Sequence, residues 1–245
     1  MMVRGLKLLN EMVTVHVITY NEEAMIKFFI NHYRKNFPNC IIKIYDNYST
    51  DNTVEIAKNL ECEINFYDTN NKLSDSKYLE IKNNCWKTSD TDWVIVCDCD
   101  ELIDINEVEL KSNHNKGVKL FQFMGYDIVN YNEKITLDEM VFGHRSQMYD
   151  KTLLFNKQSI KEINYSPGCH ICSPYGDDKT TSRLEYKLFH YKYINVDYTI
   201  KRYQLFSDRL SDENHRYGWS YHYKQKEDEI RNYYKSLEKN LEKIR

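Results

Sequence analysis

Short apolar runs alternate with helix-like segments along the first half of the chain. Four runs rich in β-branched and aromatic residues predict strands at residues 13–20, 41–45, 64–67 and 92–97. Three segments with apolar residues at helical spacing separate them, at residues 22–35, 53–60 and 76–87. This strict alternation predicts an α/β fold in which helices flank a mostly parallel sheet.

The second half of the chain is less regular. Strand-like runs occur at residues 118–123, 151–155 and 185–192, followed by a helix-like segment at 198–210. The tail, residues 227–245, places apolar residues at four-three spacing on a charged helix. Such a helix packs on the body of the protein or associates with a second copy of itself, and we expect the former.

Polar clusters follow three of the predicted strands, at residues 20–22, 46–51 and 98–101. All three fall at strand carboxyl ends, which meet at one edge of a parallel sheet, where such sheets bind ligands. On an extended strand Asp98 and Asp100 point to the same side, and Glu101 follows them. Oxygen ligands of this kind suit Mg²⁺ or Mn²⁺ bridging a diphosphate. The alternative is an Asp-rich turn that holds no metal.

Charge and hydropathy exclude several classes of protein. The net charge of −3 provides no basic excess for a general nucleic-acid binder. No apolar run approaches the roughly 20 residues that cross a bilayer, and residues 1–9 lack the features of a signal peptide. We therefore expect no transmembrane segment and a cytoplasmic protein, which would reach any membrane-bound substrate as a peripheral partner.

Cysteine usage also fits a reducing compartment. Seven cysteines are an odd number in a large chain and form no disulfide-like pattern. Cys169 and Cys172 form a CxxC pair around His170, but a structural zinc site needs four ligands, commonly from a second such pair. We expect no zinc there.

Three ordered segments together resemble the inverting glycosyltransferases of the GT-A fold, family 2. Residues 18–23 resemble the opening strand and Tyr-Asn-Glu turn of that family, and residues 46–53 its Asp-Asp-Gly-Ser-Thr-Asp-x-Thr segment. Residues 98–101 stand in the place of its Asp-x-Asp motif, although Asn47 and Tyr48 replace the usual Asp-Gly. The resemblance implies a Rossmann-like GT-A sheet in a nucleotide-sugar-binding half, residues 1–125. An irregular acceptor-side half at 126–225 and a C-terminal amphipathic helix at 226–245 follow.

The resemblance also implies roles in binding the donor and the metal. Tyr20 would lie beside the nucleotide base, and Asp46 would accept a hydrogen bond from a uracil-type ring N–H. The implied donor-binding residues are Thr19, Tyr20, Asn21, Glu22, Asp46, Asn47, Lys82 and Asp98. The implied ligands of Mn²⁺ or Mg²⁺ are Asp98, Asp100 and His190.

A fainter resemblance in the second half concerns the chemistry of the acceptor. Residues 151–156, 167–170 and 188–191 echo a family pattern that ends in His-Tyr-Gly-Tyr, and it puts His170 near the catalytic position. Ile171 replaces the usual Glu after that histidine, and the usual Glu-Asp pair is not evident. The candidate general bases are therefore Asp150, His170 and the pair Asp177 and Asp178.

These features lead us to expect a metal-dependent glycosyltransferase. It would transfer a sugar from a nucleoside-diphosphate sugar, UDP-linked, to a hydroxyl of a glycan, lipid-linked or protein acceptor, with inversion. One alternative is a nucleotide-sugar-binding module without transferase activity. A phosphotransferase using Asp98 and Asp100 is another, although that class carries its acids after the first strand.

Overall fold

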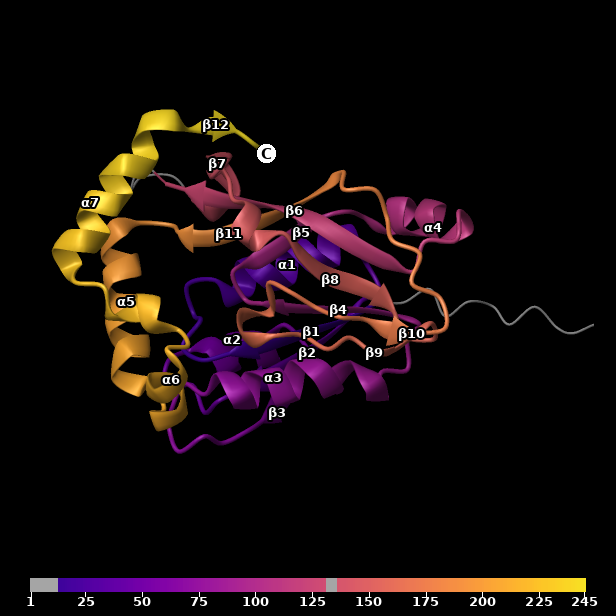
Figure 1. Cartoon of the computed structure of the whole chain (residues 1–245), viewed down its shortest axis with the longest axis horizontal. Helices are drawn as coiled ribbons and strands as arrows, with labels where there is room; N and C mark the ends of the chain where they lie inside the picture. The colour runs from indigo at the N-terminus through magenta and orange to yellow at the C-terminus, as the bar shows by residue number, and fades with distance from the viewer. Residues whose placement is uncertain (1–12, 131–135) are drawn as a thin grey trace, which may run out of the picture.

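A ten-stranded mixed sheet forms the centre of this computed structural model, within the described residues 13–130 and 136–245 (Figure 1). Residues 1–9, where the sequence lacks the features of a signal peptide, lie outside the described range. No helix in the described part of the chain is long and apolar enough to cross a bilayer.

Four parallel strands make up the half of the sheet that the sequence predicts most clearly. Their order is β3-β2-β1-β4, and their bounds are β1 Val13–Thr19, β2 Ile41–Asp46, β3 Glu63–Phe66 and β4 Trp93–Asp98. The connecting helices are α1 Ile26–Asn36, α2 Thr53–Asn59 and α3 Asp75–Asn84. The predicted β-α alternation is therefore confirmed, with each boundary within a few residues.

Both faces of β4 are buried, which explains its nearly continuous apolar sequence. Ile95 packs in the main hydrophobic cluster with Phe29 of α1. Val94 and Val96 point to the opposite face and pack in a second cluster with Trp86, just after α3. A strand buried in this way has little freedom to slip, so the residues at its carboxyl end are held in place.

Mostly antiparallel pairing extends the sheet beyond β4. The further strands are β5 Glu101–Asp104, β6 Leu120–Val129, β7 Phe142–Arg145, β8 Lys151–Asn156, β11 Tyr186–Tyr193 and β12 Glu242–Lys243. A separate ribbon joins β9 Ile160–Glu162 to β10 Tyr175–Gly176. β6 crosses the expected division at residue 125, and β11 pairs with β5 and, in parallel, with β6. The two predicted halves thus share one sheet.

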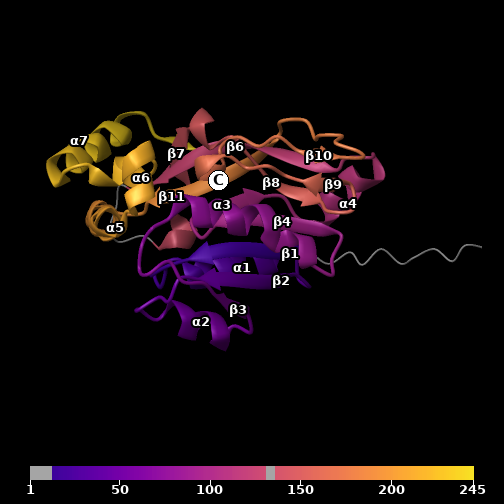
Figure 2. The same ribbon diagram turned by 60° about the horizontal axis from the view of Figure 1, so that its bottom comes forward.

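The remaining helices are α4 Glu107–Asn115, α5 Val196–Arg209, α6 Asp212–Tyr217 and α7 Glu227–Leu237. Figures 1 and 2 both show α5, α6 and α7 together at one end of the sheet. The prediction of one helix over residues 227–245 is wrong, because α7 ends at Leu237 and β12 then pairs with β7. Ile230, Tyr234 and Ile244 are all buried, as expected for a tail that packs on the body.

Candidate active site

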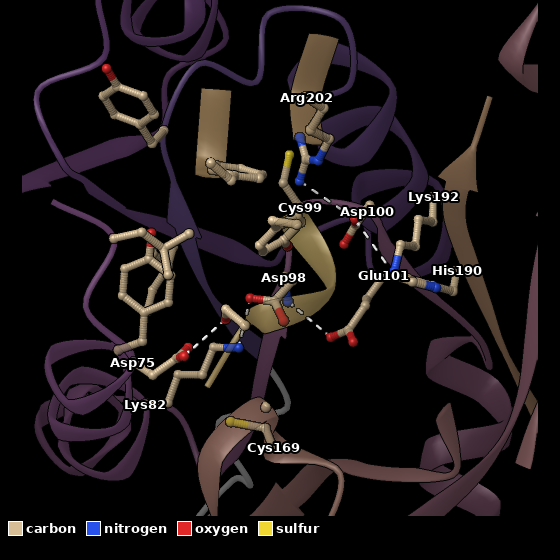
Figure 3. A pocket seen from close by; sticks show the side chains of 18 of the residues that line it. Asp75, Lys82, Asp98, Cys99, Asp100, Glu101, Cys169, His190, Lys192 and Arg202 are labelled. Atoms are coloured by element: carbon tan, nitrogen blue, oxygen red, sulfur yellow. Dashed lines mark hydrogen bonds and ion pairs between the residues drawn. The ribbon is translucent and has the colours of Figure 1, made fainter. Parts of the chain in front are cut away.

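The carboxyl ends of β1, β2 and β4 lie at one edge of the sheet, as the polar clusters predict. The parallel register pairs Ile18 with Asp98 and Thr19 with Asp46. A cavity of about 160 Å³ opens at this edge, lined by residues of β1, β4, α3, β8, β11 and α5. Both halves of the chain therefore build the site (Figure 3).

Residues 98–101 form the turn from β4 into β5 and not one continuous strand. Asp98 faces α3, where its carboxylate accepts a 2.6 Å hydrogen bond from Lys82 Nζ. Asp100 instead faces β11 and α5 (Figure 3). The expectation that the two carboxylates share one side of a strand is wrong, because the chain turns between them.

Glu101, the third acid of this turn, has a structural role. Only 1% of its surface is exposed, and its carboxylate lies 2.5 Å from Lys151 Nζ. It also accepts a hydrogen bond from the backbone N–H of Asp98, at 3.0 Å. Glu101 thus anchors the turn to β8 and fixes the position of Asp98.

The carboxylate of Asp100 is buried between two basic side chains. Its Oδ2 lies 3.6 Å from His190 Nε2 and 3.5 Å from an Arg202 nitrogen. Burial alone would raise the pKa of Asp100, but His190 and Arg202 outweigh it and hold that pKa well below its usual range. Asp100 is therefore an anion at neutral pH.

His190 is oriented by a second carboxylate. Its Nδ1 lies 2.8 Å from Asp127 Oδ1, so Nε2 is turned toward Asp100. Burial disfavours the imidazolium, yet Asp100 and Asp127 outweigh it and raise the pKa of His190 to about 9. A carboxylate behind an imidazole is also the arrangement that orients metal-binding histidines.

A divalent cation at this edge would have two protein ligands, and it would displace the Nε2 proton that the raised pKa of His190 retains at neutral pH. Asp100 and His190 supply the oxygen and nitrogen atoms, whereas Asp98 is engaged by Lys82. No group of three or more His, Cys, Asp or Glu side chains within the described residues is arranged to hold a metal. Mg²⁺-like ions typically need only one or two carboxylates, with substrate phosphates completing the set.

The predicted donor-binding residues divide into two groups. Those that line the cavity are Thr19, Tyr20, Glu22, Lys82 and Asp98, and those outside its lining are Asn21, Asp46 and Asn47. Asp46 has no exposed surface, and its oxygens accept hydrogen bonds from Thr19 and Ser49. This position does not support the expected contact between Asp46 and a base. Both carboxylate oxygens already accept hydrogen bonds that stabilise the turn after β2.

Tyr20 lies against Arg209, which belongs to the end of α5. The guanidinium carbon stands 3.1 Å from the centre of the Tyr20 ring, a cation–π contact. The Tyr20 hydroxyl donates to Asn71 at 3.2 Å, and only 6% of the residue is exposed. In this conformation Arg209 covers the ring face that the resemblance assigns to a nucleotide base.

Among the candidate bases, His170 reaches the cavity. Its Nδ1 lies 2.6 Å from the carbonyl oxygen of Met148, so this nitrogen carries the proton and Nε2 keeps its lone pair. Burial, with a contribution from Lys151, lowers the pKa of His170 to about 4. Gly168 has φ 76°, and a Cβ there would lie 2.7 Å from the His170 ring. The turn therefore needs glycine to seat this histidine.

The other candidate bases lie outside the cavity lining. The Asp150 carboxylate accepts hydrogen bonds from Gly125 N at 2.8 Å and from Arg145 at 2.7 Å. Asp177 pairs with Lys161 on the surface, and Asp178 accepts from Thr180. The predicted catalytic position of Asp150 thus finds no support in the geometry, because its carboxylate closes the loop beside β6.

Several cavity residues come from a part of the chain that sequence reasoning left without a role. Arg202, Tyr203 and Phe206 of α5, with His222 and Tyr223 of the 3₁₀ helix η5 Tyr221–Lys224, line the side facing the acid turn. Arg202 bridges the two halves, since it binds Glu22 at 2.6 Å and Asp100 at 3.5 Å. An arginine in an amphipathic helix gives no sequence signal for such a role.

Comparisons with known proteins agree with this architecture. The family model described as Glycosyl transferase family 2 matches residues 14–176, from β1 to β10. No curated protein matches the chain at a significant level. The family match ends before β11 and α5, so His190, Lys192 and Arg202 lie outside it.

Solved structures of glycosyltransferases superpose on the chain in part. TarS of S. aureus is 13% identical with a TM-score of 0.46, covering 79% of this chain and 38% of TarS. A TarS fragment solved with UDP-GlcNAc is 14% identical with a TM-score of 0.42, covering 80% of this chain and 66% of the fragment. The mannosyltransferase PcManGT from Pyrobaculum calidifontis, solved with GDP-Man and Mn²⁺, is 14% identical with a TM-score of 0.37. There the covered shares are 60% of this chain and 44% of PcManGT.

The chain thus spans only 38% of the length of TarS. Its own sheet, with parallel β3-β2-β1-β4 and an acid turn after β4, confirms the predicted α/β class. The family match covers most of the chain and includes each of the three segments that carry the resemblance. This chain belongs to glycosyl transferase family 2.

Proposed function

We propose that the chain transfers a sugar from a nucleoside-diphosphate sugar, UDP-linked, to an acceptor hydroxyl with inversion and with the help of a divalent cation. The observation that carries this proposal is the approach of Asp100 Oδ2 to His190 Nε2, at 3.6 Å, with Asp127 behind the imidazole. These groups lie in the cavity at the carboxyl edge of the parallel strands, where α/β sheets bind their ligands. Inversion rests on the family resemblance.

Asp100 and His190 would hold Mn²⁺ or Mg²⁺, and Asp98 would approach the ribose. When bound, the ion offsets the charge that develops on the departing diphosphate. Lys82 and Arg202 orient the carboxylates through ion pairs of 2.6 Å and 3.5 Å. The cavity walls thereby fix the donor before the acceptor arrives, which lowers the entropic part of the barrier.

His170 would take the proton of the acceptor hydroxyl. Its lowered pKa keeps it neutral at pH 7, and its free Nε2 belongs to a residue that lines the cavity. A positioned general base contributes about two to four decades of rate. The proposed acceptor is a hydroxyl of a glycan, of a lipid-linked molecule or of a protein.

Asp100→Ala tests the proposal most directly. We expect Mn²⁺ to strengthen UDP binding to the unaltered protein by at least about tenfold, which is about 1.4 kcal/mol. In the variant this effect of Mn²⁺ should vanish, because one of the two protein ligands is gone. Isothermal titration of UDP with and without Mn²⁺ measures both quantities.

Asp104→Ala is the matched control for this titration. Asp104 is exposed at the end of β5, so the same change there should leave the Mn²⁺ effect intact. Equal UDP affinity with and without Mn²⁺ in the unaltered protein would refute metal-dependent donor binding. Circular dichroism and the melting temperature show whether Asp100→Ala has kept its fold.

A nucleotide-sugar-binding module without transferase activity is the second candidate. It is favoured by the lowered pKa of His170, which makes this histidine a weak base. Release of UDP from UDP-sugars in the presence of Mn²⁺ separates the two candidates. A protein that binds these donors, yet neither hydrolyses nor transfers them, is a binding module.

We also propose a cytoplasmic location. All seven cysteines are free thiols, which supports a reducing compartment.

A further inference from the structure

Three of the cations that line the cavity are already paired with a carboxylate. Lys82 Nζ lies 2.6 Å from Asp98, and Lys151 Nζ lies 2.5 Å from Glu101. Arg202 lies 2.6 Å from Glu22. Each of these cations therefore has its charge balanced before any substrate binds.

Lys192 lines the same cavity and is different. Within the described residues its Nζ has no hydrogen bond or ion pair; it lies 5.3 Å from the centre of the Tyr203 ring and 5.8 Å from that of Tyr193. The side chain is partly buried, with its nitrogen directed toward Asp100 and His190 (Figure 3). A partly buried ammonium without a counter-ion is costly, unless an anion arrives to balance it.

The position of Lys192 places this charge beside the proposed metal ligands. Lys192 follows His190 by two residues on β11, and both residues line the cavity. The backbone N–H of the intervening Tyr191 donates to the carbonyl oxygen of Asp100 at 2.8 Å. The neighbouring carboxylates are already engaged, Asp127 by His190 and Asp100 by both His190 and Arg202.

We propose that Lys192 binds a phosphate group of the substrate in the loaded site, and this inference rests on the proposed function. The terminal phosphate of the donor diphosphate is one source of that group, and a phosphate carried by the acceptor is the other. Lys192 stands where the resembled His-Tyr-Gly-Tyr pattern has glycine, so this contact is a feature of this chain's own sequence. A charge-assisted hydrogen bond of this kind strengthens binding by about one to two decades.

The test compares Lys192→Met with Lys192→Arg. Methionine keeps the apolar length of the side chain and removes the charge, whereas arginine keeps the charge. UDP and UMP are titrated into each protein in the presence of Mn²⁺, because UMP lacks the terminal phosphate. We expect Lys192→Met to weaken UDP binding by at least about tenfold with little change for UMP, and Lys192→Arg to restore most of the loss.

Lys201→Met is the matched control, since Lys201 is exposed on α5 and lies outside the cavity lining. If Lys192→Met leaves UDP binding intact, inorganic phosphate is added to the UDP-saturated proteins and the melting temperature is measured. A shift in the unaltered protein that Lys192→Met loses assigns Lys192 to an acceptor phosphate. The inference is overturned if Lys192→Met changes neither UDP binding nor the shift caused by inorganic phosphate. It is also overturned if Lys201→Met weakens binding as much as Lys192→Met does.

Inorganic pyrophosphate separates this inference from the proposed function. If the unaltered protein binds pyrophosphate but no nucleotide or nucleotide sugar, the proposed donor is wrong. Loss of that pyrophosphate binding in Lys192→Met would still support the phosphate contact. If the protein binds UDP and Lys192→Met changes neither UDP binding nor the response to inorganic phosphate, the proposed function stands and the contact is refuted.

Discussion

At the scale of single residues, the site combines side chains of fixed charge with two neutral imidazoles, those of His170 and His222. The ion pair of Glu101 with Lys151 leaves this carboxylate with a structural task, whereas within the described residues His170 Nε2 has no hydrogen-bond partner. The Met148 carbonyl and Gly168 hold that ring in place. Of the two histidines, His170 has the higher pKa, about 4 against about 3, and it is the one that we propose as the proton acceptor.

His170→Gln should lower kcat by about two to four decades, because glutamine cannot accept the acceptor proton at neutral pH. UDP affinity should stay near that of the unaltered protein, since His170 is not among the groups that we propose to hold the donor or the metal. Initial rates with a UDP-sugar and single titrations of UDP measure the two effects. A kcat close to the unaltered value would assign the proton to another group.

His215→Gln provides the control for this variant. His215 is exposed on α6 and lies outside the cavity lining, so the same chemical change there should leave the rate unaffected.

At the scale of elements, α5 closes the cavity and ties the two ends of the chain together. Arg202 joins Glu22, 180 residues earlier in the sequence, to the acid turn. Burial raises the pKa of Glu22 to about 7, even with Arg202 beside it. The pair is therefore sensitive to the loss of either partner.

Arg202→Met should destabilise the protein by about 3 kcal/mol at pH 8 and above, because the unaltered protein then holds the ion pair and the variant must bury Glu22 with a proton or without a counter-charge. Glu22→Gln combined with Arg202→Met should cost less than the sum of the two single changes. Urea unfolding of the four proteins in this cycle measures the coupling. Additive losses would mean that the ion pair contributes no specific stability.

The cost of Arg202→Met should also grow as the pH rises above 7, because the unaltered protein then gains the ion pair, whereas in the variant the pKa of Glu22 lies higher still. Below pH 7 Glu22 takes up a proton and carries no unbalanced charge.

At the scale of the whole molecule, stability should depend on two histidines buried away from the cavity. Burial lowers the pKa of His16 to about 3 and that of His32 to about 4, each below the ordinary value of about 6.5. His16 lies within hydrogen-bonding distance of Ser89 and Tyr45, and His32 within that of the Ile103 carbonyl. Both histidines are therefore neutral in the folded protein.

Below about pH 6.5 the unfolded chain binds protons that the folded chain cannot, so stability should fall between about pH 6.5 and about pH 4. Each such histidine contributes a slope of about 1.4 kcal/mol per pH unit. His16→Gln should lower the free energy of unfolding. It should also reduce the dependence of that free energy on pH by the contribution of one histidine. Urea unfolding across this pH range measures both, and an unchanged slope would mean that His16 does not titrate in this way.

Local patterns in the sequence were enough for the parallel half of the fold. β1 to β4 and α1 to α3 follow apolar periodicity, which depends on near neighbours in the chain. The helix α4 carried an overlooked signal of the same local kind. Asn106 and Glu109 form a capping box, which can be read from their spacing.

The antiparallel half and the end of the tail depended on distant partners. The heptad-like spacing of residues 227–245 continues past Leu237, yet the chain there leaves the helix and pairs with β7 as β12. Strand pairing across about 100 residues is a tertiary interaction, and helical periodicity carries no information about it.

The sequence by itself determined the class of fold, the edge of the sheet that holds the site and the acids that mark it. These follow from hydrophobic periodicity and from the rule that parallel strands end at one edge. Only the tertiary structure decided how the charges are paired. The carboxylates of Asp46 and Glu101 hold turns, and Arg202 lies beside Asp100. Lys192 has no ion pair with any of the described residues. Periodicity predicts which side chains are buried, but the partner of a buried charge depends on residues far away along the chain.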